Sequence, residues 1–127
     1  MYLTGFAADP VLLTTALAGE NVTLHCILDN QSLNITQIEW TKTGEFTDHK
    51  IILYHPDHGV HSFWDNVTVE EVVDQGRRLR GAHLHLSGVQ IGDSGLYNCD
   101  LSTYPHGSMR VSNKLEITGN VYTLVSI

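Results

Sequence analysis

The feature that most restricts the possible folds of this chain is a tyrosine two residues before a cysteine, Tyr97-Asn98-Cys99. Tyr97, Cys99 and Leu101 alternate with polar residues, so they share one face of a predicted strand. The Tyr-x-Cys order is typical of a tyrosine corner, in which the phenol bonds back to the backbone near the start of its strand. The sequence therefore predicts a strand that is buried on one face and that anchors an all-β core.

The chain has a second cysteine, Cys26, far upstream of Cys99. Two cysteines can form a metal pair or a redox pair, so their context decides between these and a disulfide. Four Asn-x-Ser/Thr sequons favour a secreted or cell-surface context, in which a long-range disulfide is the natural interpretation. We therefore predict a Cys26–Cys99 disulfide and candidate glycosylation at Asn21, Asn30, Asn34 and Asn66.

Short alternating apolar segments bounded by turn residues predict strands along the whole chain. Two strand-like segments separate the strand that contains Trp40 from the strand that ends near Val73. The predicted strands cover 10–13, 22–28, 38–40, 50–54, 60–64, 66–73, 82–86, 97–101 and 109–117. We expect one domain over residues 10–118, a flexible lead-in at 1–9 and an exit or linker segment at 119–127.

The composition excludes several classes of partner. The formal net charge is −7 with the histidines counted neutral, whereas nucleic acids and acidic lipid surfaces need basic footprints. The one basic run, Arg77-Arg78-Leu79-Arg80, is predicted to be a solvated loop. No apolar run reaches the ~18 residues of a membrane span, and the first residues lack the features of a signal peptide. We expect the natural protein to be anchored in a membrane by a segment outside this sequence.

The sequence offers little support for catalysis or for a metal site. It has no nucleophile elbow, metalloprotease helix or phosphate-binding loop, so we predict neither an enzyme nor a cofactor. His25, His83 and His85 are predicted on the outer face of neighbouring strands, where three imidazoles suit zinc. We favour cross-strand polar packing there. If several histidines lie at a binding face, their protonation near pH 6 is expected to weaken association.

The combination of Cys26, Trp40 and Asp93-x-Gly95-x-Tyr97-x-Cys99 resembles an immunoglobulin V-set domain. This resemblance implies an all-β sandwich with an ABED sheet packed on a GFCC′C″ sheet and one disulfide between them. The two strand-like segments before residue 66 correspond to C′ and C″, which makes the domain variable-type. The sequence lacks the Phe-Gly-x-Gly bulge of antibody and T-cell-receptor domains, because residues 108–113 read Ser-Met-Arg-Val-Ser-Asn.

Three shorter motifs resemble one V-set group, the nectins, the poliovirus-receptor-like proteins and their lymphocyte receptors. Residues 103–107, Thr-Tyr-Pro-His-Gly, are similar to the group's Thr/Ser-Phe/Tyr-Pro-x-Gly loop, and Thr36-Gln37 to its Thr-Gln segment. Residues 52–59 match its Ala-x6-Gly segment in part, since Ile52 replaces the alanine. The residues of these motifs are most similar to those of the lymphocyte receptors in the group, namely DNAX accessory molecule, Tactile and TIGIT.

The resemblance implies a cell-surface immune or adhesion receptor that binds a nectin or nectin-like V domain, or itself. In this group each domain inserts a loop aromatic, here Tyr104, into a recess beside a glycine, here Gly59, on the opposing GFCC′C″ face. The implied partner-binding residues are Thr36, Gln37, Tyr54, Pro56, Gly59, Thr103, Tyr104, Pro105 and Gly107. The alternative is a V-set receptor domain that binds an unrelated ligand through its loops. A further alternative is that Tyr104 packs against its own strand and contacts no partner.

Overall fold

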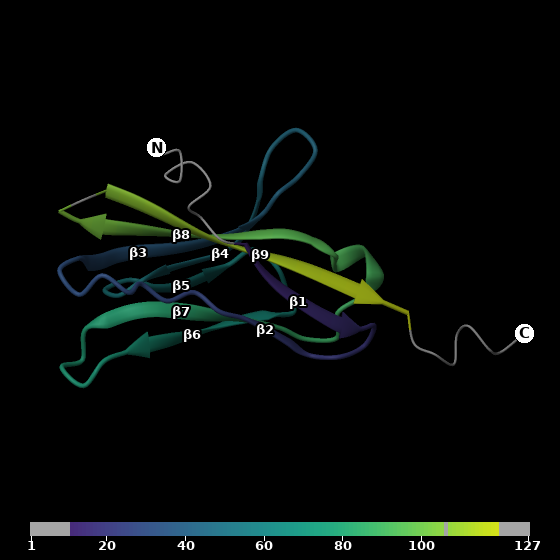
Figure 1. The fold of residues 1–127 in the computed structure, drawn as a ribbon, viewed down its shortest axis with the longest axis horizontal. Coiled ribbons are helices and arrows are strands. Elements are labelled where there is room, and N and C mark those ends of the chain that lie inside the picture. The colour runs from purple at the N-terminus through teal and green to yellow at the C-terminus, as the bar shows by residue number, and fades with distance from the viewer. Residues whose placement is uncertain (1–10, 106, 120–127) are drawn as a thin grey trace, which may run out of the picture.

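The computed structural model describes residues 11–105 and 107–119 and shows two β-sheets packed face to face (Figure 1). The six-stranded sheet, called the front sheet below, has the order β1-β9-β8-β3-β4-β5, and the three-stranded back sheet has the order β2-β7-β6. The strands are β1 (Val11–Leu17), β2 (Val22–Leu24), β3 (Asn34–Lys42), β4 (His49–His55), β5 (Gly59–Ser62), β6 (Val67–Val73), β7 (Leu79–Leu86), β8 (Gly95–Tyr104) and β9 (Gly107–Thr118). A short 3₁₀ helix, η2 (Ile91–Asp93), precedes β8.

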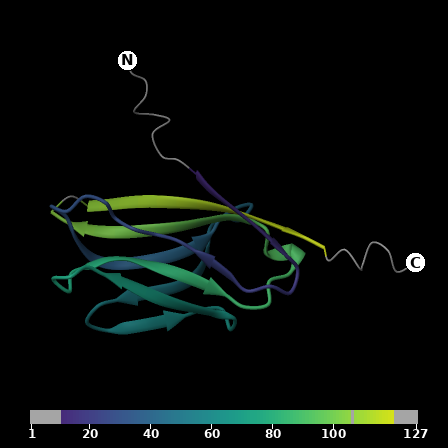
Figure 2. The same cartoon turned by 60° about the horizontal axis from the view of Figure 1, so that its bottom comes forward.

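The predicted variable-type sandwich is confirmed, with β9, β8, β3, β4 and β5 in the positions of G, F, C, C′ and C″. The prediction that the first strand belongs to an ABED sheet is wrong. The strand β1 pairs in parallel with β9, from Val11 opposite Ser112 to Leu17 opposite Thr118, so it lies at the edge of the front sheet (Figures 1 and 2). A short turn at Ala18 and Gly19 connects β1 to β2. The chain crosses from the front sheet to the back sheet at this turn, so β1 and β2 lie on opposite sides of the sandwich.

The core confirms the tyrosine corner and the disulfide. The Tyr97 hydroxyl donates a hydrogen bond of 2.5 Å to the Asp93 carbonyl, and burial raises the pKa of this tyrosine. Cys26 and Cys99 are bonded across the two sheets with a sequence separation of 73 residues. Trp40 is the cross-strand partner of Cys99 and is fully buried, so the indole lies beside the disulfide as predicted.

The predicted alternation also holds in detail. Val22, Leu24, Cys26 and Leu28 are buried, although regular pairing of β2 with β7 ends at Leu24. In β3 a bulge between Ile35 and Gln37 shifts the register by one residue. A bulge adds one unpaired residue to a strand, so residues three apart can face the same side. Ile35 and Ile38 are accordingly both buried.

The basic run is not a solvated loop, which corrects the prediction for two of its arginines. Arg80 lies in β7, is only 5% exposed and donates to the carbonyls of Leu28, Asn30 and Leu33 at 2.8–3.0 Å. Arg78 donates to the carbonyls of Gln31 and Leu33. The two guanidinium groups supply donors to a segment between β2 and β3 that has no strand partner along most of its length.

Within residues 11–105 and 107–119, no helix is long and apolar enough to cross a membrane.

Candidate protein-binding site

The β8–β9 hairpin forms one end of the front sheet (Figure 1). Tyr104 is the last residue of β8 and is 68% exposed, so its ring does not pack into its own domain. Thr103 pairs with Gly107 across the hairpin and is buried, and its hydroxyl donates to the Gly107 carbonyl. Thr103 therefore shapes the turn and does not offer a contact surface. His106 lies outside the described residues, and the peptide bond between Tyr104 and Pro105 is cis.

The strand register places Tyr104 on the outer face of the front sheet. Residues two apart on a strand share a face, so Tyr104 shares its side with Ser102 and Asp100, while Leu101 and Cys99 point into the core. Gln37 is the cross-strand partner of Ser102 and is half-buried on this outer face. Thr36 is exposed at the bulge, and its hydroxyl donates to the Ser102 carbonyl at 3.1 Å.

The turn between β4 and β5 lies at the same end of the same sheet. His55 pairs with Gly59, and Tyr54 pairs with both Ile38 and Val60, which puts the turn level with the start of β3 and the end of β8. Pro56 is exposed in this turn. Gly59 has a φ of +86°, and an added Cβ would meet no atom within 4 Å. At ~4.8 Å per strand, this turn lies about 10–14 Å across the sheet from Tyr104.

Tyr54 is separate from the other predicted contact residues. Its cross-strand partner is the buried Ile38, so the Tyr54 ring lies on the inner side of the front sheet near the sheet edge. Its hydroxyl donates to a Glu71 carboxylate oxygen on β6. Burial and this carboxylate raise the pKa of Tyr54 to about 12. Tyr54 thus connects the two sheets at their edge and does not share the face that carries Tyr104.

A charged cluster lies on the outer face of the front sheet, and the motif analysis did not identify it. Arg110 on β9 makes two hydrogen bonds to Asp100 on β8, at 2.7 and 3.0 Å, and lies 3.7 Å from Asp48. These contacts, led by the hydrogen bonds to Asp100, raise the pKa of Arg110. Lys50 and Glu39 are 3.7 Å apart beside it. The pairing follows from the turn: once Thr103 faces Gly107, the antiparallel register places Asp100 opposite Arg110.

The histidines predicted on the outer face of the back sheet do lie together. The Nδ1 atoms of His25 and His83 are 3.2 Å apart, and His85 contacts Thr23 at 2.7 Å and Glu70 at 2.8 Å. Desolvation and the neighbouring His25 lower the pKa of His83. Across the described ranges, no group of three or more His, Cys, Asp or Glu has the arrangement to hold a metal ion.

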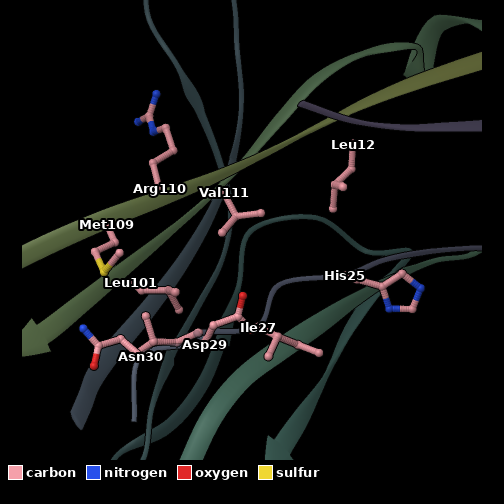
Figure 3. Close-up of a pocket in the computed structure, with 10 residues that line it drawn as sticks. Leu12, His25, Ile27, Asp29, Asn30, Leu101, Met109, Arg110 and Val111 are labelled. Atoms are coloured by element: carbon pink, nitrogen blue, oxygen red, sulfur yellow. The ribbon is translucent and has the colours of Figure 1, made fainter. Parts of the chain in front are cut away.

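A groove of about 520 Å³ opens at the sandwich edge beside the β8–β9 hairpin (Figure 3). The partly exposed apolar side chains of Leu12, Ile27 and Met109 line it together with Leu101 and Val111. Sequence reasoning missed this groove because β1, β9 and the segment after β2 form it together. The sequence had placed β1 in the other sheet, where it would not lie beside β9.

Comparison with known proteins supports the resemblance found in the sequence. A family model described as "Immunoglobulin V-set domain" matches residues 10–118. T-cell surface protein tactile of Rattus norvegicus is 31% identical over 99 residues, which are 76% of this chain and 16% of that protein. CD226 antigen of Macaca mulatta is 27% identical over 95 residues, which are 75% of this chain and 28% of that protein. The chain therefore spans less than a third of the length of these relatives.

Solved structures at low sequence identity share the fold. A structure of VGSC beta subunits has a TM-score of 0.69 at 16% identity and covers 85% of this chain and 92% of that one. Murine CRIg gives a TM-score of 0.69 at 16% identity, over 84% of this chain and 92% of that one. The fold, the disulfide, the tyrosine corner and the family model agree. The chain belongs to the immunoglobulin V-set family and is related to the immune receptors Tactile and CD226.

Proposed function

We propose that this domain is the ligand-binding part of a cell-surface immune or adhesion receptor, and that it binds a nectin or nectin-like V domain, or a second copy of itself. Tyr104 enters a recess on the opposing domain, and the β4–β5 turn around Gly59 receives the partner's aromatic. The proposal needs no cofactor. In the whole protein the domain lies on the outside of the cell.

The observation that carries the proposal is the exposure of Tyr104 on the same face and at the same end as Gly59. An exposed tyrosine on a short hairpin loses little conformational freedom on binding and offers an apolar ring with one polar tip. Gly59 leaves open space where any other residue would place a side chain. A domain that carries both features on one face can exchange them with a similar domain about a two-fold axis.

Apart from Tyr54, which lies on the inner side of the sheet, the remaining predicted contact residues are compatible with this face as the binding surface. Thr36 and Gln37 lie on β3 between Tyr104 and the β4–β5 turn, and Pro56 is exposed in that turn. Thr103 and Gly107 act through the shape of the hairpin. The exposed acidic and basic groups around Arg110 lie on the same face, where they set the orientation of a charged partner more than its affinity.

The test is the affinity of a Tyr104→Ala variant for soluble nectin and nectin-like ectodomains, with self-association measured in parallel by sedimentation. We expect a loss of about 2 kcal/mol or more, the range of an interface hot spot. Phe46→Ala is the control, since Phe46 is an aromatic that is even more exposed than Tyr104 and lies in the β3–β4 loop at the other end of the sheet. Unchanged affinity of a folded Tyr104→Ala variant contradicts the mechanism.

The second candidate, a V-set receptor that binds an unrelated ligand through its loops, is favoured by the apolar groove beside the hairpin. The two candidates differ in which surface a ligand protects. Protection from hydrogen exchange in the β4–β5 turn around Gly59 supports the first, and protection in the segment after β2 around Ile27 supports the second.

A further inference from the structure

We propose that the sequon Asn34-Ile35-Thr36 carries an N-linked glycan that limits the access of a partner to Tyr104. This inference rests on the proposed function, because Tyr104 is the contact that the glycan shields. An N-linked glycan is bulky and hydrophilic, so its effect on an interface depends on where its root lies.

The strand register places the root of this glycan beside Tyr104. Asn34 is the first residue of β3 and the direct cross-strand partner of Tyr104, the last residue of β8. Directly paired residues of antiparallel strands have Cα atoms about 4.5–5.5 Å apart. Both residues are exposed. The backbone that carries a sugar on Asn34 therefore lies one strand spacing from the backbone of Tyr104, whose ring is proposed to enter the partner.

The amide of Asn34 is oriented so that its nitrogen is free for the sugar. The Oδ1 atom accepts a hydrogen bond of 3.0 Å from the Arg78 guanidinium. A guanidinium can only donate, so the oxygen must face Arg78 and the nitrogen must point away from it. Among the described residues, no hydrogen bond from the Asn34 nitrogen is present, whereas the Asn66 nitrogen donates to the Ser87 carbonyl at 2.9 Å.

The root is also held rigidly, because the whole sequon is part of the folded sheet. Ile35 is buried in the core, and Thr36 donates to the Ser102 carbonyl of β8. Arg78 and Arg80 hold the carbonyls of the preceding segment. A glycan on a fixed root sweeps a limited volume, and here that volume lies at the Tyr104 end of the sheet.

The other sequons divide into one at this end and two at the opposite end. Asn21 contacts Gly88 and Asn66 contacts Ser87, so both lie just beyond the last residue of β7, while Arg78 precedes the first. The eight residues of β7 span about 23 Å at ~3.3 Å per residue. Glycans at these two positions are remote from Tyr104. Asn30 lies near Asn34, and its Oδ1 accepts from the backbone and hydroxyl of Ser32, so the orientation of its amide does not distinguish it from Asn34 and its sequon needs a variant of its own.

The experiment compares glycoforms of the chain secreted from a glycosylating host, with occupancy of Asn34 measured by mass spectrometry. Asn34→Gln, and wild type trimmed by an endoglycosidase to one N-acetylglucosamine, are expected to bind the ectodomains at least about tenfold tighter than untrimmed wild type, equivalent to ~1.4 kcal/mol. Thr68→Ala removes the Asn66 sequon and is expected to leave the affinity unchanged. An unoccupied Asn34, an unchanged affinity of Asn34→Gln, or the gain appearing only with Asn30→Gln overturns the inference.

Two further measurements separate this inference from the proposed function. If Tyr104→Ala abolishes binding but the glycan has no effect, only the present inference fails; if Tyr104→Ala binds normally in the Asn34→Gln background, the proposed function fails. The rate of chemical nitration of Tyr104 needs no partner. We expect trimming to accelerate nitration at Tyr104 several-fold, with Tyr54, on the other side of the sheet, as the unchanged internal reference. Equal rates at Tyr104 contradict the shielding.

Discussion

Arg80 shows how a single residue fixes the path of the chain at the end of the domain that carries Tyr104. Its guanidinium is almost fully buried and has three backbone carbonyls as acceptors, one from each of Leu28, Asn30 and Leu33. Arginine suits this task because its planar fork carries five donors, whereas a lysine ammonium is a single point charge. The sequence did not indicate this role, since an arginine that serves carbonyls needs no acidic neighbour in the sequence.

We expect Arg80→Lys to lower the free energy of unfolding by about 2 kcal/mol, because buried carbonyls are left without donors. Arg77→Lys is the matched control: the same change at an exposed position three residues earlier is expected to stay within about 0.5 kcal/mol. Urea unfolding monitored by Trp fluorescence measures both variants. Equal stabilities of the two variants would show that the carbonyls of the segment find water instead.

The β8–β9 hairpin is the element on which the proposed binding depends, and its shape rests on a glycine. Gly107 has a φ of +97°, a conformation that costs other residues roughly 1–2 kcal/mol. Gly107→Ala is therefore expected to lose about that much stability and to weaken partner binding, since relaxation of the turn moves Tyr104. Gly92→Ala provides the control. An added Cβ meets no atom within 4 Å at either Gly92 or Gly107, but of these two glycines Gly107 alone has a positive φ. Thermal unfolding and partner affinity are measured for both, and a fully active, stable Gly107→Ala variant contradicts the prediction.

Most strands were predictable because their inward residues alternate, as Tyr97, Cys99 and Leu101 do in β8. The position of β1 was not predictable in this way. Its residues are largely exposed on both faces, so the pattern carries no information about which sheet it joins.

For the site, motif matching identified Tyr104 and Gly59, but it placed Tyr54 with them by sequence position alone. The register, which alternates sides at each residue, turns Tyr54 to the inner side.

The stability of the whole molecule is expected to fall on the acid side of about pH 6.5. Folding lowers the pKa of His83, which faces His25, Glu70 on β6 and His85 of its own strand. A lowered pKa means that the unfolded chain binds the proton more tightly. The contribution of His83 is therefore complete above its unfolded value of ~6.5 and is lost as the pH falls through the folded value. On the alkaline side, the raised pKa of Tyr54 gives a contribution that is lost as the pH rises through about 12.

Unfolding free energies measured from about pH 5 to pH 8 test this loss of stability at acid pH, called the acid limb of the stability curve below. His83→Gln is expected to flatten it, and His58→Gln, in the exposed β4–β5 turn, is expected to leave it unchanged. An acid limb of the same slope in His83→Gln assigns the loss of stability to other groups.

The length of β9 sets the distance between the hairpin turn and Thr118. Its twelve residues carry the chain from the turn that follows Tyr104 to Thr118, a distance of about 36 Å at ~3.3 Å per residue. This strand is hydrogen-bonded on both sides, to β8 and β1, so it acts as a stiff spacer. Thr118 and Tyr104 therefore lie at opposite ends of the sandwich, so a pulling force applied between these two residues runs along the strands.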